Sequence, residues 1–555
     1  MSHRSLILLA AGLAALAACQ PKTPPPPPVT VEAARLTEIV HALSSDEFEG
    51  RAPGTVGEEK TVAYLIGKFR DLGLEPGGEH GDWTQTVPLL HMQLGRPRTL
   101  TLTTGRKARA LRQGVEISIG TVRNAERIDV RDAPLVFVGY GVTAPERDWD
   151  DYKDVDLHGK VAVMLVNDPD FAALPGEPVA DRFGGRRMTY YGRWTYKFEE
   201  AARRGAIAAL IVHDTEGVGY GWPTVTASAG EAYDLAMRDP ASQLALRGWL
   251  ASEYAATLFH DAGLDLEQLR SAARRADFKP VDMKTTLTAD VPVEITAAAS
   301  RNVLAKLTGT KAPDETVMFA AHWDAYGIGA ADADGHTVRP GANDDALGVA
   351  GVLELARVFA AGPRPRRTLI FAAWTAEERG LLGSSAYAEE PLYPLEKTVA
   401  NLTLDILQTA GPARDVLLVG EGQSELEDDL ARAAAAQGRV VTPEALPERG
   451  LFYRADHFPL ARRGVPVLLL MAMSGGADLV EGGREAGDAW LTDYMRCYHQ
   501  TCDRWSPDWD LRGAVQDITL FHTIGYELAN SRRWPDWREG SEFRAIRAQS
   551  AAARR

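Results

Sequence analysis

From about residue 300 onward, short apolar runs alternate with helical segments, and this alternation restricts the fold more than any other feature of the chain. The runs that indicate strands are 317–321, 368–374, 399–406 and 465–473. A helix rich in alanine, valine and leucine is expected over 347–359. Such alternation predicts an α/β fold with a mainly parallel, mixed sheet sandwiched by helices. In sheets of this kind, ligands lie beyond the carboxyl ends of the strands.

Several acidic and histidine residues lie at or just past the end of an apolar stretch that is expected to be a strand or to open a helix. They are His322, Asp344, Glu377, Glu378, Asp405 and His499. Carboxylates mixed with imidazoles form a ligand set that zinc accepts. Five ligands and one spare carboxylate are enough for two metals and a base. Two metals about 3.5–4 Å apart form a hydrolytic centre that activates water at neutral pH.

Each acidic residue also has a simpler explanation when it is taken alone. Asp344 could cap the helix that follows it. Glu377 and Glu378 could form an acidic first helical turn. Asp405 lies within an apolar strand, where either a metal or a salt bridge could offset its burial. Their occurrence at the ends of successive strands favours one shared site.

The chemistry of these groups suggests a separate role for each residue. Asp324 lies two residues after His322 and can hold the second ring nitrogen of that imidazole. Asp344 can present its two oxygens to two cations and bridge them. Of the adjacent Glu377 and Glu378, one can bind metal while the other moves a proton, since two neighbouring carboxylates repel unless a positive charge lies beside them.

The 555-residue chain is long enough for two to four domains at roughly 150 residues each. Residues 130–288 contain strands and a helix but no cluster of possible ligands, which predicts an inserted, smaller, β-rich α/β domain without chemistry of its own. The expected division is 31–129 and 289–530 for the two parts of the main domain, 130–288 for the insertion, and 531–555 for a charged, solvated C-terminal tail.

The first residues are typical of an exported bacterial lipoprotein. Residues 1–18 have a basic start and a short apolar run, which indicates a signal peptide. The sequence Leu16-Ala17-Ala18-Cys19 resembles a lipobox, so Cys19 is the expected lipidation site and membrane anchor. An ordinary secretory signal with a chance cysteine is the alternative. Residues 19–30 form a proline-rich tether that favours extended polyproline II. The expected location is the bacterial cell envelope.

Charge and cysteine content restrict partners and redox state. The formal net charge of -15 argues against nucleic acid, which requires a basic face. Apart from Cys19, the only cysteines are Cys497 and Cys502, which flank Tyr498 and His499. An extracytoplasmic location permits a disulfide between them. Two zinc thiolates are the alternative, but C-x₄-C is not a usual zinc spacing.

Together these motifs resemble a known enzyme family. The matching residues are His322-x-Asp324, Gly341-x-x-Asp344, Glu377-Glu378, Asp405 and Tyr498-His499. In order, spacing and flanking strands they resemble the zinc-dependent exopeptidases of the aminopeptidase Y and glutamate carboxypeptidase type. The resemblance covers most of 31–125 and 300–530, and the run from Asp46 to Arg51 is similar to the opening of that family. Residues 130–288 resemble the protease-associated domain that such enzymes often carry.

The resemblance implies a role for each matching residue. It implies two zinc ions, one bound by His322 and Asp405, the other by Glu378 and His499, with Asp344 bridging both. It also implies Glu377 as the general base, Asp324 as the residue that orients His322, and Tyr498 as the group that stabilises the oxyanion. Residues 497–503 are similar to a disulfide-clamped version of the last ligand motif.

A substrate pocket is also implied, with departures from the family pattern. The run 453–458 matches a pocket loop, which makes Tyr453, Asp456 and His457 the expected pocket residues. Ala455 replaces a small polar residue of that loop. Trp323 and Ala325 replace the tyrosine and histidine that are more usual near the first ligand. These departures affect the shape of the pocket and not the binding of metal.

The function implied is removal of N-terminal residues from peptide substrates by metal-activated water. A carboxypeptidase or dipeptidase using the same two metals is the second candidate. A glutaminyl cyclase built on one zinc is disfavoured because Asp344 and both histidines are present. A non-catalytic binding protein with a degenerate peptidase fold would have lost ligands, and none is lost here. No G-x-S-x-G motif supports a serine hydrolase.

Overall fold

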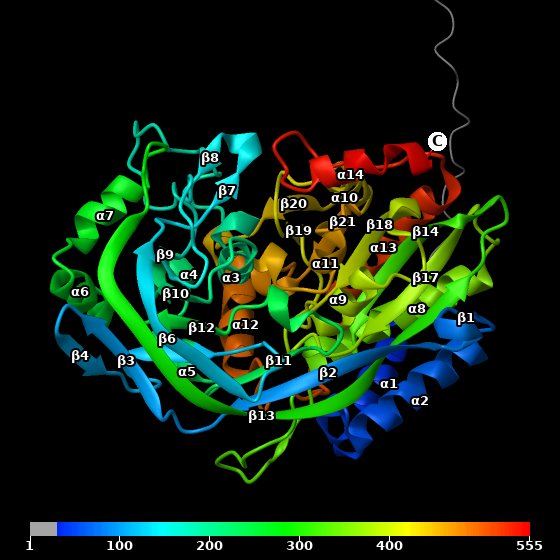
Figure 1. The fold of residues 1–555 in the computed structure, drawn as a ribbon. Helices are drawn as coiled ribbons and strands as arrows, with labels where there is room; N and C mark the ends of the chain where they lie inside the picture. The colour runs from blue at the N-terminus through cyan, green and yellow to red at the C-terminus, as the bar shows by residue number, and fades with distance from the viewer. Residues whose placement is uncertain (1–29, 555) are drawn as a thin grey trace, which may run out of the picture.

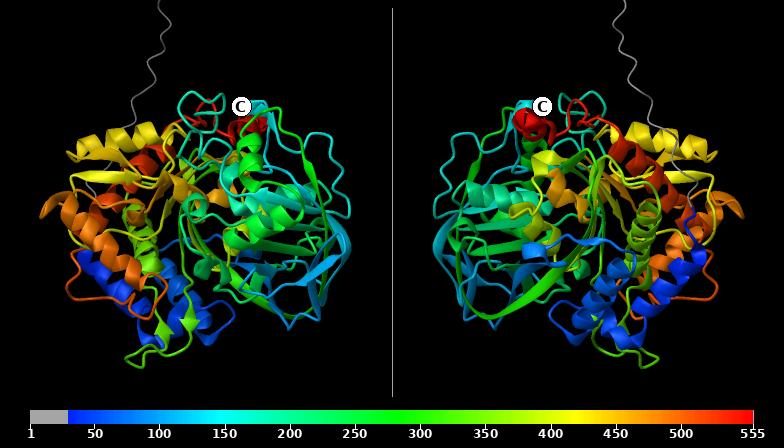
Figure 2. Two further views of the ribbon diagram at one scale, coloured as in Figure 1. Left: turned by 90° about the vertical axis from the view of Figure 1, so that its left-hand side faces the viewer. Right: turned by 90° about the vertical axis from the view of Figure 1, so that its right-hand side faces the viewer.

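The computed structural model describes residues 30–554 and consists of two lobes joined by one very long strand (Figures 1 and 2). The predicted signal peptide, Cys19 and nearly all of the proline-rich tether lie outside the described residues. Within residues 30–554 no helix has the length and apolar character needed to cross a bilayer. The long strand is β13, which spans 27 residues from Val281 to Leu307.

The main lobe is built on parallel strands in the order β21–β18–β14–β17, followed by β13, which runs antiparallel to β17. Their bounds are β14 Ala312–His322, β17 Arg367–Trp374, β18 Thr398–Leu404 and β21 Val467–Leu470. Strands β17, β18 and β21 are fully buried, and β14 is buried from Thr316 to His322, as expected for parallel strands covered on both faces. The predicted α/β class with a mixed, mainly parallel sheet is confirmed.

Successive residues of these strands point to opposite sides of the sheet. Phe319 and Phe371 belong to one core cluster, which also takes in side chains of α1, α8 and α13. Met318 and Ile370 belong to a second cluster on the opposite side. This alternation is the period-2 geometry of a strand, and it explains why helices cover both faces.

The helices of the main lobe follow the predicted alternation. Their bounds are α1 Ala33–Leu43, α2 Val56–Asp71, α8 Leu347–Ala361, α9 Leu382–Glu389, α10 Leu426–Ala436, α11 His457–Ala461, α12 Gly483–Cys497, α13 Arg512–Asn530 and α14 Arg544–Gln549. The loop between α1 and α2 carries a short 3₁₀ turn, η1, from Asp46 to Arg51. Two short hairpin strands, β15 (Gly327–Ile328) and β16 (Val338–Arg339), lie against this turn.

The smaller lobe has its own parallel strands, β6–β9–β10–β12, with β5 added antiparallel at the edge. The bounds are β3 Thr99–Thr104, β4 Lys107–Ala110, β5 Ile117–Gly120, β6 Arg127–Phe137, β9 Val161–Leu165, β10 Ala208–Val212 and β12 Leu246–Leu250. Its helices are α3 Trp194–Arg203, α4 Thr215–Val218, α5 Trp222–Thr226, α6 Ser252–Asp261 and α7 Leu266–Ala273.

Strand β13 arches along the lower edge of the molecule in Figure 1 and takes part in both sheets. It pairs with β3 and β6 in the smaller lobe, with β2 (Thr84–Leu94) along its middle, and with β17 in the main lobe. A further strand, β11 (Glu231–Leu235), pairs with β2. The predicted domain boundaries at 129/130 and 288/289 therefore fall inside β6 and β13.

The core of the smaller lobe also begins earlier than the sequence indicated. Its largest apolar cluster includes Leu90, Leu100 and Ile117, all N-terminal to residue 130. Strands β3 to β5 therefore belong with this lobe and not with the first part of the main domain. Apolar alternation in these strands gives no sign of which sheet they join, because β3 pairs with β13 and β5 pairs with β12, each more than a hundred residues away.

The last residues are packed and differ from the expected solvated tail. Trp537 and Phe543 are buried in a core cluster of the main lobe, and Arg547 is 2% exposed. The Trp537 indole donates to the Gly464 carbonyl at 3.0 Å, and Arg547 Nη1 donates to the Thr398 carbonyl at 3.1 Å. Two aromatic side chains anchor a segment whose arginines had suggested solvent exposure.

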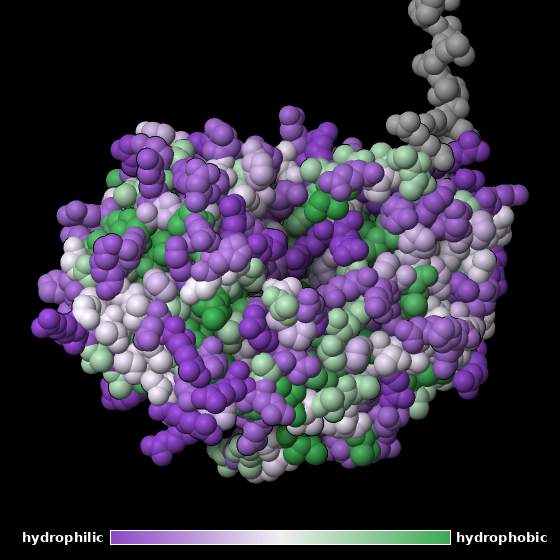
Figure 3. All heavy atoms as spheres, in the orientation of Figure 1, coloured by the Kyte–Doolittle hydropathy of each residue, from purple (hydrophilic) through white to green (hydrophobic). Residues whose placement is uncertain are grey.

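The face of the molecule seen in Figure 3 is mostly hydrophilic, with apolar side chains in small, separated groups. A surface of this kind does not indicate a broad apolar docking area on that side.

Candidate metal centre

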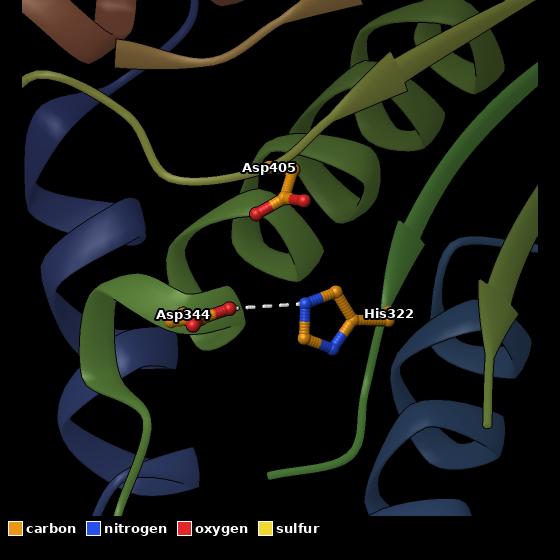
Figure 4. Close-up of side chains that lie close together, drawn as sticks. All are labelled: His322, Asp344 and Asp405. Atoms are coloured by element: carbon orange, nitrogen blue, oxygen red, sulfur yellow. Dashed lines mark hydrogen bonds and ion pairs between the residues drawn. The ribbon is translucent and has the colours of Figure 1, made fainter. Parts of the chain in front are cut away.

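Three predicted ligands converge from three different elements (Figure 4). His322 is the last residue of β14, Asp405 directly follows β18, and Asp344 lies in the turn before α8. His322 Nε2 lies 3.1 Å from Asp344 Oδ1. One ligand atom from each of the three residues lies within 4.8 Å of the others, and all three residues are buried. The carboxyl ends of adjacent parallel strands bring them together.

Asp344 also belongs to a second group, with Glu378 and His499. His499 Nε2 lies 3.2 Å from Asp344 Oδ2 and 3.1 Å from Glu378 Oε2. The two oxygens of Asp344 thus face two different histidines. The structure brings together all five predicted metal ligands, and the carboxylate shared by the two groups is the one predicted to bridge.

Unpartnered polar atoms test whether this donor set suits metal ions. Among the described residues, Asp344 Oδ2, Asp405 Oδ1 and His499 Nε2 are buried and accept or donate no regular hydrogen bond. Buried polar atoms normally have a partner, and leaving one without a partner is costly. Carboxylate oxygens and imidazole nitrogens that converge and have no hydrogen-bond partner form a ligand set that fits divalent cations of the zinc type.

The electrostatics of the site favour binding of a cation. Burial, together with the neighbouring Asp344 charge, raises the pKa of Asp405 to about 8. Burial also raises the pKa of Glu378, again with a contribution from Asp344. The pKa of Asp344 itself is lowered: burial would raise it, but the close contacts with the imidazoles of His322 and His499 outweigh that effect. Carboxylates crowded in this way are stabilised by a bound cation.

Glu377, the predicted base, lies beside the ligands. Its Oε2 atom is 4.0 Å from His322 Nε2. Burial raises the pKa of Glu377 well above its usual value, and the charges of Glu378 and Asp456 add to that rise. A buried carboxyl group with a raised pKa next to a group of metal ligands is suited to accept and return a proton.

Asp324 fixes the positions of several of these groups. It is fully buried, and its two carboxylate oxygens accept the backbone N–H groups of Glu377 at 3.0 Å and Glu378 at 3.4 Å. Its Oδ1 atom lies 3.6 Å from His322 Nδ1, and its carbonyl oxygen lies 3.1 Å from the same nitrogen. One side chain therefore orients an imidazole ligand and the pair of glutamates.

We expect Asp324→Asn to weaken metal binding by about 10- to 100-fold, the usual effect of removing a carboxylate that supports a histidine ligand. The amide keeps the shape but can accept fewer hydrogen bonds from the Glu377 and Glu378 backbone. Competition with a fluorescent zinc chelator measures the affinity. Asp148→Asn, at a fully exposed side chain, is the matched control. Equal affinity in both variants would refute the orienting role.

Two residues without a predicted role hold the loop that carries Asp344. Asp503 accepts the Asn343 N–H at 3.0 Å and the Asp344 N–H at 3.1 Å through its carboxylate. It directly follows Cys502, which forms a disulfide with Cys497 around His499. The loops that carry the bridging aspartate and the last histidine are thus connected.

Arg51 is the second such residue and is completely buried. Its guanidinium donates to the carbonyls of Trp323 at 2.7 Å, Gly341 at 2.9 Å, Pro340 at 2.5 Å and Leu43 at 2.9 Å. It links η1 to the chain on either side of the first ligands and adds a fixed positive charge near the carboxylates. The Asp46–Arg51 run is similar to the N-terminal opening of the exopeptidase family, but the sequence alone indicates no role for Arg51.

Tyr498, the predicted oxyanion group, lies next to the metal ligands. Its side chain packs in a core cluster of the main lobe, with the ring centroid 3.6 Å from that of His499. The positive charge of Arg454 acts on its hydroxyl and opposes the rise in pKa that burial causes. The tyrosine is close enough to the site for the predicted role.

The three predicted pocket residues lie in different surroundings. Tyr453 is buried and donates to Glu542 Oε1 at 2.9 Å. Asp456 Oδ1 accepts the Ser384 hydroxyl at 2.5 Å. His457 is fully buried beside Phe452, and burial lowers its pKa to about 3. Asp456 influences the metal centre through its charge, whereas Tyr453 and His457 are part of the core around it.

Comparison with known proteins agrees with this arrangement. Residues 302–522 match the sequence profile described as Peptidase family M28, and this range contains every ligand together with Glu377 and Asp324. The similarity to this family covers that segment of the chain. The predicted resemblance to a di-zinc exopeptidase family is confirmed for this M28 segment. The likeness of residues 130–288 to a protease-associated domain stays a prediction.

Individual relatives are similar to parts of this chain. A probable zinc metalloprotease of Pyricularia oryzae is 37% identical over 153 residues, which are 26% of this chain and 26% of the relative. Leupeptin-inactivating enzyme 1 of Streptomyces exfoliatus is 30% identical over 211 residues, covering 37% of this chain and 43% of the relative. The chain thus matches less than half the length of these relatives. The solved aminopeptidase from Aneurinibacillus sp. strain AM-1 is similar at 21% identity and a TM-score of 0.48, covering 90% and 94% of the two chains.

Proposed function

We propose that the protein is a zinc-dependent exopeptidase that removes N-terminal residues from peptides. The observation that carries this proposal is the sharing of Asp344 between two groups of metal ligands, with Glu377 beside them. His322, Asp344 and Asp405 would hold one zinc ion. Asp344, Glu378 and His499 would hold the second. The match of this segment to Peptidase family M28 supports peptide-bond hydrolysis as the reaction.

Zinc ions, when bound, lower the pKa of a water molecule toward about 7 and polarise a carbonyl group. Glu377 is held at its backbone N–H by Asp324, so its carboxylate has a fixed direction. In the proposed reaction Glu377 accepts the proton of the attacking water and later donates it to the leaving amine. The Tyr498 hydroxyl donates a hydrogen bond to the developing oxyanion.

We expect a panel of aminoacyl anilides to be hydrolysed by the zinc-loaded protein. A chelator should abolish this activity, and added zinc should restore it, because all five ligands are supplied by one chain. Elemental analysis should then find two zinc ions per chain. The same substrates with an acetylated amino group should be hydrolysed far more slowly. Hydrolysis of acetylated and free substrates at equal rates would contradict an aminopeptidase, and activity that survives chelation would contradict a metalloenzyme.

A further inference from the structure

A cavity of about 300 Å³ lies next to the metal centre. Residues of β2, β11, η1 and the segment that follows Ala325 line it. The residues that matter for its chemistry are Ala52, Leu89, His91, Tyr233, Tyr326 and Arg379. A volume of this size is at the lower end of the range for small-molecule sites.

The cavity is separated from the metal ligands by little more than one aromatic ring. Tyr326 lines the cavity, and its ring centroid lies 4.4 Å from that of the ligand His499. Arg379, which also lines the cavity, directly follows the ligand Glu378. A peptide bound at the metals can therefore reach the cavity within one or two residues, since an extended chain advances roughly 3.3–3.6 Å per residue.

Arg379 has a well-defined position but no anionic partner. Its guanidinium lies over the rings of Tyr233, at 5.0 Å from the centroid, and Tyr326, at 5.1 Å. Within residues 30–554 it forms no ion pair and no hydrogen bond. The five N–H donors of a guanidinium match a carboxylate in a bidentate manner. Two aromatic rings thus hold the Arg379 guanidinium in place, and in the described part of the chain its N–H groups remain free to donate hydrogen bonds.

The other charged groups around the cavity are engaged elsewhere. Glu231 Oε1 contacts His91 Nε2 at 2.9 Å and accepts the Tyr233 hydroxyl at 3.2 Å. Glu49 lies 3.8 Å from Lys60 Nζ. Among the described residues that line the cavity, Arg379 carries the one permanent positive charge. The position therefore favours an anion.

We propose that this cavity is a substrate subsite in which Arg379 binds a carboxylate of the peptide, so that short peptides with a carboxylate within one or two residues of the scissile bond are preferred. The inference rests on the proposed function and adds the substrate class. The carboxylate could be the C-terminus of a di- or tripeptide or the side chain of an acidic residue, which the same guanidinium would recognise.

The test compares Ala-Ala and Ala-Ala-Ala with their C-terminal amides, and Ala-Asp-amide with Ala-Asn-amide. Arg379→Gln should lower kcat/KM for the carboxylate substrates by about 10- to 100-fold, mainly through KM, the range for a lost charged hydrogen-bonding partner. It should leave the neutral amides unchanged. Arg379→Lys should recover part of the preference. Arg106→Gln, at an exposed arginine on the turn between β3 and β4, is the control.

Calorimetric binding of the same peptides to the zinc-loaded Glu377→Gln protein is a second readout, independent of turnover. An Arg379-dependent preference among the C-terminal acids identifies the terminal carboxylate, and a preference only for Ala-Asp-amide identifies a side chain. Equal free-acid to amide ratios in the wild type and Arg379→Gln, in turnover and in binding, would overturn the subsite. Arg379-dependent binding without hydrolysis of any peptide would instead refute the proposed function and retain the subsite.

Discussion

Replacing Glu377 with glutamine should slow hydrolysis by two to four orders of magnitude while the metal remains bound. The amide cannot accept the proton of the attacking water, and general acid–base catalysis of this kind contributes about 10²–10⁴ to the rate. Glu377 is not a member of either ligand group, so the zinc content should be unchanged. Initial rates with an aminoacyl anilide and elemental analysis of the same sample measure both quantities.

The position of Glu377 makes this substitution a sharp test. The backbone N–H of the residue is held by Asp324, and glutamine preserves both its size and that contact. A loss of folding is therefore not expected. Glu390→Gln, at an exposed glutamate just after α9, is the control and should behave as wild type. A Glu377→Gln protein that hydrolyses substrate at the normal rate would exclude this residue as the base.

Replacing Asp344 with alanine should remove both metals together. The two oxygens of this residue face His322 and His499, so a single truncation takes one ligand from each group. We expect a zinc content below one ion per chain and activity at the background level. Zinc should raise the Tm of the wild type, because a ligand that binds only the folded state stabilises it, and it should no longer raise the Tm of the variant.

A second, exposed group of possible ligands provides the control for that experiment. Asp332, Asp334 and His336 lie close together on the surface, in the hairpin between β15 and β16. Exposed acidic groups of this kind are common without a metal. Asp334→Ala should therefore leave the zinc content, the activity and the zinc-dependent rise in Tm unchanged. If Asp344→Ala retained two zinc ions, the shared carboxylate would not be the bridge.

The sequence was sufficient to predict the main sheet and the ligands because both depend on local patterns. The apolar run before His322 and the run that contains Asp405 are the buried strands β14 and β18, and parallel strands place their carboxyl ends at one edge. The order of these polar residues along the chain was therefore enough to predict that distant side chains form one group.

The remaining features depend on contacts between distant segments that leave little local signal. Arg51 contacts the Pro340 carbonyl, 289 residues away, and Asp503 contacts the Asn343 N–H, 160 residues away. A single buried arginine or aspartate has no periodicity by which a partner could be inferred. The position of Arg379 between two tyrosines likewise depends on Tyr233, which reaches the cavity from a strand paired with β2.

The continuity of β13 has a practical consequence for dissecting the molecule. Its backbone is hydrogen-bonded to β3 and β6 at one end and to β17 at the other, so neither sheet is complete without it. Deleting residues 130–288 would cut β6 and β13 in mid-strand. The strand edges left behind would have unpaired backbone N–H and C=O groups, which promote aggregation. Point substitutions leave the pairing of β6 and β13 intact and are the safer route to learning what the smaller lobe contributes.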